Sequence, residues 1–144
     1  MRKLIFGMGM LLLGASTFVA CEDDKIVEPT ALPTNANTFI ATNFPDATIV
    51  RVEQDNQGYS VDLSNRIDVE FNNAGEWVEV DGEDDVAIPV GFIPKVIVDY
   101  IDLNYANIQI NGIEKNNQGY EVDLLTVDTD LIFDQEGKFV RVDL

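Results

Sequence analysis

A stretch of nine residues occurs twice in this chain, and this repeat constrains the fold more than any other feature. Residues 55–63 read DNQGYSVDL and residues 116–124 read NNQGYEVDL, identical at seven of the nine positions. The similarity extends in both directions, and residues 32–81 match residues 93–144. The offset between matching residues is 61 up to the end of the nine-residue stretches and 62 after them, because the second copy has one inserted residue. A copy of about 50 residues is near the lower limit for an independent hydrophobic core. We therefore expect two copies of a small domain that share one sheet and one helix layer.

Each copy begins with a helical pattern. Apolar residues spaced at i, i+3, i+4 and i+8 fall on one face of a helix. They are Ala36, Phe39, Ile40 and Phe44 in the first copy and Ile97, Tyr100, Ile101 and Tyr105 in the second. Pro33 and Pro94 suit the first helical turn, and Pro45 ends the first helix.

Strands follow the helix in each copy. Residues 59–63 and 67–71 alternate apolar and polar side chains, and the sequence NNAG between residues 72 and 75 suits a hairpin. ATIVRVEQ upstream and EWVEV downstream supply two further strands. The sequence predicts an α+β fold in which a helix and a four-strand antiparallel meander occur twice, with both helices on one face of the sheet. Residues 82–92 connect the copies.

The N-terminus has the pattern of an export sequence. Arg2 and Lys3 precede an apolar segment that ends at Ala20, and Cys21, the only cysteine, follows directly. FVAC is similar to the lipobox of bacterial lipoproteins, in which cleavage precedes a lipid-modified cysteine. We interpret residues 1–20 as a lipoprotein signal peptide, with a plain cleaved signal or an uncleaved anchor as alternatives.

Acidic residues follow the predicted lipidation site. Glu22, Asp23 and Asp24 resemble the tag that directs some Gram-negative lipoproteins to the outer face of the outer membrane. We place an acidic tether at residues 21–31, and the alternative for these three acids is that they are only part of an ordinary solvated tether. The expected location is the outer membrane, facing the periplasm or the cell surface, and the expected membrane contact is the lipid anchor.

The composition excludes several classes of function. The formal charge of −17 becomes −19 when residues 1–20 are removed, which disfavours nucleic acid and favours a basic protein or divalent ions. The chain has no histidine, and its one cysteine is assigned to the anchor. Zinc sites, cysteine nucleophiles and Ser-His-Asp triads are therefore excluded. We expect no catalytic residues, no cofactor and no enzyme activity.

Several motifs resemble the PepSY-like family, which is also described as beta-lactamase-inhibitor-like. They are the strand GYSVDL at residues 58–63, the hairpin FNNAGEW at residues 71–77, and their second copies GYEVDL and FDQEGKF. The resemblance covers most of the chain after Cys21. It implies a tandem helix-plus-sheet fold, export from the cytoplasm and a role in binding or inhibition. It brings no catalytic residues.

The strand pattern also predicts a binding face. Alternation directs acidic side chains away from the helices; they are Asp62, Asp68, Glu70 and Glu79 in the first copy and Glu121, Asp123, Asp128 and Asp130 in the second. Trp77 and Phe139 share the alternation of Glu79 and Arg141, opposite Val78, Val80, Val140 and Val142. We therefore expect both rings on the open face, where they would anchor a protein partner. The alternative is that both rings complete the core.

Two acidic clusters could in principle bind Ca²⁺. One consists of Asp81, Glu83, Asp84 and Asp85, and the other of Asp128, Asp130 and Asp134. Neither has the spacing of an EF-hand loop, so a solvated acidic surface is the preferred interpretation, and no metal site is predicted. The sequence thus favours a non-catalytic lipoprotein that binds a protein through its open sheet face. The alternative is an envelope-associated structural or ion-binding lipoprotein without a specific protein partner.

Overall fold

The computed structural model describes residues 25–143. The predicted signal peptide, Cys21 and the acidic residues Glu22, Asp23 and Asp24 lie outside these residues. Lys25 and Ile26, within the predicted tether, form the short strand β1 (Lys25–Ile26). A 3-10 turn, η1 (Pro29–Ala31), connects β1 to the first helix.

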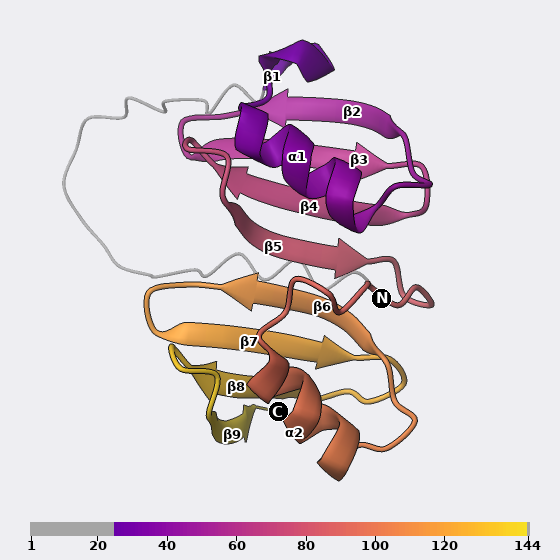
Figure 1. Ribbon diagram of the computed structural model, residues 1–144, viewed down its shortest axis with the longest axis vertical. Helices are drawn as coiled ribbons and strands as arrows, with labels where there is room; N and C mark the ends of the chain where they lie inside the picture. Colours follow the sequence, from indigo (N-terminus) through magenta and orange to yellow (C-terminus); the bar gives the residue numbers. More distant parts are fainter. Residues whose placement is uncertain (1–24, 144) are drawn as a thin grey trace, which may run out of the picture.

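The described residues form one antiparallel sheet whose strands follow each other in chain order, from β1 to β9 (Figure 1). The strands of the first copy are β2 (Ile49–Gln54), β3 (Gly58–Leu63), β4 (Ile67–Asn72) and β5 (Trp77–Gly82). Those of the second are β6 (Ile110–Lys115), β7 (Gly119–Leu124), β8 (Asp130–Asp134) and β9 (Phe139–Asp143). The predicted pair of four-strand meanders is confirmed, and β1 adds an outermost strand next to β2.

One helix belongs to each copy, and both lie on the same face of the sheet (Figure 1). α1 (Thr34–Asn43) follows Pro33 and α2 (Lys95–Asn104) follows Pro94. Ala36, Ile97 and Ile101 are almost completely buried under them. The apolar residues of the strands join these side chains in a single core, and none of residues 25–143 is a buried polar or charged residue. Among the described residues, no helix has the length and apolar character needed to cross a membrane.

The repeated NQG sequence makes the same turn in both copies. Asp55 Oδ1 accepts the backbone N–H groups of Gln57 and Gly58, and Asn116 Oδ1 does the same for the second copy. A Cβ added to Gly58 would lie 1.8 Å from the carbonyl oxygen of Phe71 in β4. The turn therefore requires glycine, which explains why both copies retain it.

The copies are joined by β5 and β6. Val80 pairs with Ile113, and the side-chain amide of Asn111 donates to the carbonyl oxygens of Gly82 and Val86, at 2.9 and 2.8 Å. The connecting segment also contributes to the packing, because Ile88 is 4% exposed and its N–H donates to Ile110. The joint is thus an ordinary strand pair of the same sheet.

Candidate functional site

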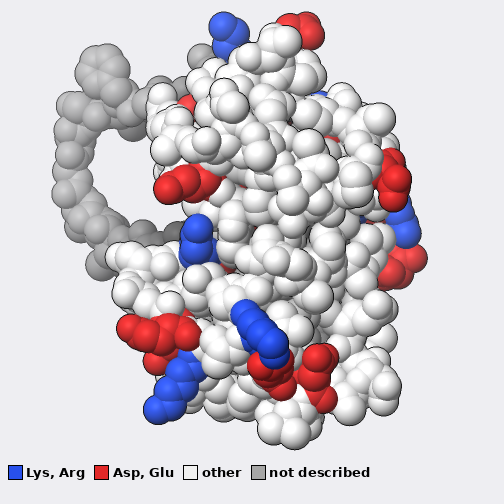
Figure 2. All heavy atoms as spheres, in the orientation of Figure 1, with Lys and Arg blue, Asp and Glu red and all other residues white. Residues whose placement is uncertain are grey.

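We call the face of the sheet away from the helices the open face. It carries two rows of mostly acidic side chains. In the first row, strand pairing aligns Glu53, Ser60, Glu70, Glu79, Glu114, Glu121, Ile132 and Arg141 from β2 to β9. In the second row it aligns Arg51, Asp62, Asp68, Asp81, Gly112, Asp123, Asp130 and Asp143. The opposite, helix-bearing side is largely uncharged, with scattered charged side chains (Figure 2). The fold thus concentrates negative charge on one face.

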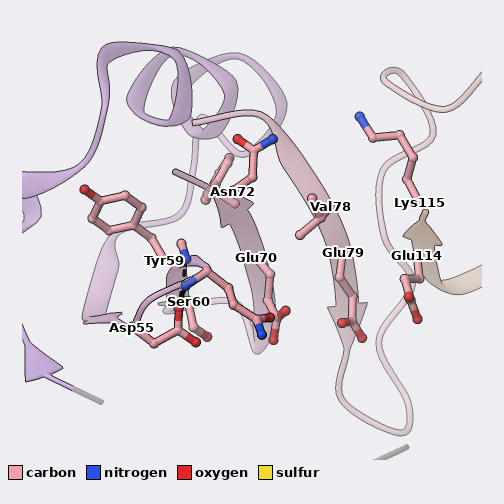
Figure 3. Close-up of a pocket in the computed structure, with 12 residues that line it drawn as sticks. Asp55, Tyr59, Ser60, Glu70, Asn72, Val78, Glu79, Glu114 and Lys115 are labelled. Carbon is pink, nitrogen blue, oxygen red and sulfur yellow. Dashed lines mark hydrogen bonds between the residues drawn. The ribbon is translucent and has the colours of Figure 1, made fainter. Parts of the chain in front are cut away.

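Glutamates from three strands lie side by side at the centre of this face. Glu70, Glu79 and Glu114 point the same way from β4, β5 and β6 beside a hollow of about 350 Å³ (Figure 3). Partial burial, followed by repulsion from Glu70 and Glu114, raises the pKa of Glu79 to about 7. The pKa of Glu70 is also raised, first by burial and then by neighbouring carboxylates. Because burial and nearby like charges both disfavour the ionised form, Glu79 is partly protonated at neutral pH.

A second group of carboxyls surrounds Gly112. A Cβ at this position would lie 2.9 Å from Asp81 Oδ1 and 3.3 Å from Asp123 Oδ2, so the glycine leaves space for both carboxyls. Burial, a hydrogen bond with Asp130 and the charges of Asp130 and Asp81 raise the pKa of Asp123 to about 8. The pKa of Glu121 is raised as well, mainly by burial. The open face therefore carries carboxyls with raised pKa values in both copies.

The predicted positions of Trp77 and Phe139 are wrong, because both rings lie on the helix side. Trp77 stacks on Phe39 of α1, with ring centroids 6.2 Å apart and an interplanar angle of 25°. Phe139 stacks on Tyr100 of α2 at 4.6 Å and 11°. The alternative interpretation, that the rings complete the core, is therefore the one the structure supports.

A β-bulge at the start of the last strand of each copy causes this error. Trp77 pairs with Phe71 whereas Glu79 pairs with Glu70, so one extra residue of β5 lies between the two pairs. The same shift separates Phe139 from Arg141 in β9. An extra residue interrupts the alternation of side chains, so Trp77 and Glu79 lie on opposite faces.

The bulges also change the predicted positions of two valines. Val78 and Val140 were expected to point toward the helices, but each lines a hollow, Val78 beside Glu79 and Val140 beside Arg141. Val80 keeps its predicted place in the core and is 0% exposed. The bulges thus provide each hollow with an apolar wall.

The other predicted binding residues do lie on the open face, but not all together. Glu70 and Glu79 are direct partners, and Asp68 lies in the second row on the same strand as Glu70. Arg141 lies at the far edge in β9, where it pairs with Asp143 at 3.1 Å. Glu114 was missed because β6 was not assigned to a face, although it follows Ile113 just as Glu53 follows Val52 in the first copy.

The acidic clusters considered for Ca²⁺ are divided by the fold. Asp85 pairs with Arg66 at 2.9 Å, whereas Asp81 belongs to the open face. Asp134 Oδ1 accepts the N–H groups of Glu136 and Lys138 in the β8–β9 hairpin. Within residues 25–143, no group of three or more acidic side chains is arranged to hold a metal ion.

Three solved structures from Bacteroides are similar to this chain. The first, a "putative calcium-regulated periplasmic protein" of Bacteroides thetaiotaomicron, is 32% identical with a TM-score of 0.78, over 85% of this chain and 98% of its own. The second, a "putative periplasmic protein" of Bacteroides vulgatus, is 30% identical with a TM-score of 0.79, over 86% and 99%. The third, a "putative periplasmic protein of unknown function" from the same species, is 31% identical with a TM-score of 0.77, over 84% and 99%.

No curated protein matches the chain. A family model described as "Putative beta-lactamase-inhibitor-like, PepSY-like" matches residues 17–72 and again residues 58–141. The two matches reflect the two copies seen in the sheet. The chain is therefore a member of the PepSY-like family with two tandem repeats.

Proposed function

We propose that this protein is a non-catalytic periplasmic binding protein whose open face docks a basic protein. The observation that supports this most directly is the alignment of carboxylates in two rows across strands of both copies. Export is supported by the description of the three similar structures as periplasmic. The binding surface then belongs to the whole sheet rather than to one copy.

The energetics of the open face favour a cationic partner. Glu79 and Asp123 carry raised pKa values, first because they are partly buried and then because their neighbours are also acidic. Lysine or arginine side chains placed among these carboxyls would relieve the repulsion and lower the pKa values. Electrostatic complementarity of this kind also increases the association rate. The hollow lined by Val78 and Tyr59 offers a small apolar contact within the acidic surface.

Isothermal titration calorimetry with polylysine as the probe tests this proposal. The triple substitution Glu70→Gln, Glu79→Gln and Glu121→Gln should weaken binding about tenfold at low salt, since each lost charge contact contributes a few tenths to 1 kcal/mol. The control Glu28→Gln, Glu76→Gln and Glu136→Gln removes the same formal charge from exposed positions outside the two rows. If both triple variants bind equally weakly, net charge rather than the open face explains the binding.

We also propose that Cys21 carries a lipid anchor in the outer membrane. The unpaired cysteine after FVA supports this. Cys21→Ala should prevent incorporation of labelled fatty acid and release the protein from the membrane fraction. Continued labelling of this variant would contradict the anchor.

The acidic residues after Cys21 provide a separate proposal about surface display. Substituting Glu22, Asp23 and Asp24 together by alanine should reduce protease accessibility on intact cells. Unchanged accessibility would assign these residues to a plain solvated tether.

Divalent cation binding is the second candidate function. It is favoured by the description of the Bacteroides thetaiotaomicron structure as a "putative calcium-regulated periplasmic protein", and Asp81 and Asp123 beside Gly112 would supply two of the oxygen ligands. Oxygen ligands suit Ca²⁺. Titration with CaCl₂ should raise the melting temperature of the native chain but not of Asp123→Asn. No shift for the native chain would remove this candidate.

A further inference from the structure

The last strands of the two copies, β5 and β9, occupy equivalent positions in the repeat but have different neighbouring strands in the sheet. Val80 in β5 is 0% exposed, whereas Val142, its counterpart in β9, is 39% exposed. β5 is covered by β6, but in the described residues no strand follows β9 on its outer side. An edge strand presents unpaired N–H and C=O groups that can pair with another chain. β5 has β6 as an antiparallel neighbour, whereas β9 has no such neighbour among the described residues.

The opposite edge of the sheet is partly covered by β1. β1 pairs with β2 through Lys25–Gln54 and Ile26–Glu53, and the N–H of Val27 donates to the carbonyl oxygen of Val52 at 3.0 Å. A second copy of the chain therefore cannot offer its β2 edge without displacing β1. β1 spans only two residues, so the longer outermost strand of the described sheet is β9.

The charges on β9 define one register for such a pair. Arg141 and Asp143 flank Val142 and lie in the two rows of the open face. In an antiparallel pair centred on Val142, each Arg141 lies opposite the partner's Asp143, and the two valines lie opposite each other. A pair centred on Arg141 would instead place two guanidinium groups opposite each other, which is unfavourable. Charge complementarity thus selects the register centred on Val142.

We propose that two copies of this chain form a symmetric dimer by antiparallel pairing of their β9 strands, centred on Val142. The two-fold axis is perpendicular to the sheet, so the helices of both copies lie on one side and the open faces on the other. Pairing buries the exposed part of Val142 and continues the sheet across the interface. This surface is the edge of the sheet and is independent of the polylysine binding tested above.

Disulfide cross-linking of the full chain tests the register. Directly opposite residues of an antiparallel pair have Cβ atoms about 4.5–5.5 Å apart, so Val142→Cys should form a covalent dimer under mild oxidation. Val50→Cys on β2, a valine that is 67% exposed, is the matched control and should remain monomeric. The native chain, with Cys21 alone, provides the blank. Equal cross-linking of Val50→Cys and Val142→Cys would overturn the proposal.

Charge exchange provides a second test in native solution. By analytical ultracentrifugation, Arg141→Asp and Asp143→Arg should each weaken the dimer about tenfold, because each places like charges opposite one another. The double variant restores pairs of opposite sign and should restore the dimer. A native chain that stays monomeric at all concentrations, or a double variant as weak as the single ones, would overturn the proposal.

Discussion

The two copies share one fold but differ in how their stacked rings are covered. In the first copy, Trp77 contacts Phe39 and also Phe92 of the connecting segment, at 5.2 Å, and Lys115 Nζ of β6 lies 4.5 Å from its ring centroid. In the second copy, Phe139 contacts Tyr100 and Phe133. The first cluster is therefore larger because the second copy and the connector pack against it. Position within the sheet, and not only local sequence, determines how much each residue contributes to stability.

The same comparison applies to charge. Glu79 in β5 and Arg141 in β9 occupy equivalent positions after the bulge. Glu79 lies between Glu70 and Glu114 at the centre of the sheet, whereas Arg141 lies at the edge beside Ile132. The first row is thus acidic where the copies meet and carries a cation at the β9 edge.

Substitution of the stacked rings should show the largest difference between the copies. Trp77→Ala should destabilise the fold by about 3 kcal/mol, near the lower end for large-to-small aromatic changes because Trp77 is half-buried. Phe139→Ala should cost about 1.5 kcal/mol, below the range for fully buried aromatic residues, because its ring lies in the edge strand β9 and has fewer ring neighbours. Urea denaturation of both variants measures the difference. Equal losses would mean that the connector and β6 add nothing to the packing of the first copy.

Val80 and Val142, the equivalent valines of the two copies, should show the next largest difference in the stability lost on substitution. Val80→Ala removes fully buried methyl groups and should cost about 1.5 kcal/mol, whereas Val142→Ala should cost about 0.5 kcal/mol in dilute protein. Thermal melts at low concentration check this prediction. A Val142→Ala loss as large as that of Val80→Ala would show that β9 is covered even in the monomer.

The smallest expected difference between the copies is in the pH dependence of stability, to which Glu79 contributes and Arg141 does not. Because the folded pKa of Glu79 is raised from 4.5 to about 7, the folded state binds more protons than the unfolded state between these values. Stability contributed by protonation is therefore present below pH 4.5 and is lost as the pH rises through 7. With allowance for solvent screening, we expect a loss of about 1 kcal/mol for this residue.

The matched variants are Glu79→Gln and Arg141→Gln. Glu79→Gln should flatten the fall in melting temperature between pH 5 and pH 8, because glutamine does not titrate. Arg141→Gln should leave the slope unchanged, because arginine stays charged throughout this range. A native protein whose stability rises across this range would contradict the raised pKa.

The internal repeat made the fold predictable from the sequence. Alignment of the copies predicted both helices and all four strands of each meander, because the apolar face of the helix and the alternation of the strands each occur twice. The side of the sheet on which Trp77 lies could not be obtained from alternation, because a bulge adds a residue without changing the apolar pattern of Val78 and Val80. One signal was available in the repeat, where Phe39 aligns with Tyr100 and Trp77 aligns with Phe139. In each copy these two aromatic positions stack on each other, Phe39 on Trp77 and Tyr100 on Phe139.

The candidate site was only partly predictable. Acidic side chains on β3, β4 and β5 were assigned to the open face by alternation, but their alignment into rows depends on strand register. Register across the β5–β6 joint, which places Glu114 next to Glu79, depends on how the connector folds. The raised pKa values follow from that packing and have no local sequence pattern.

Proton release on polylysine binding tests the central claim most directly. At pH 7, Glu79 is about half protonated and Asp123 largely protonated, so a cation on the open face should release about one proton per binding site. Calorimetry in two buffers of different ionisation enthalpy counts these protons. We predict a heat that depends on the buffer in the native chain and depends less on it in Glu79→Gln. A heat that is the same in both buffers for the native chain would mean that the cation binds away from these carboxyls and would contradict the account.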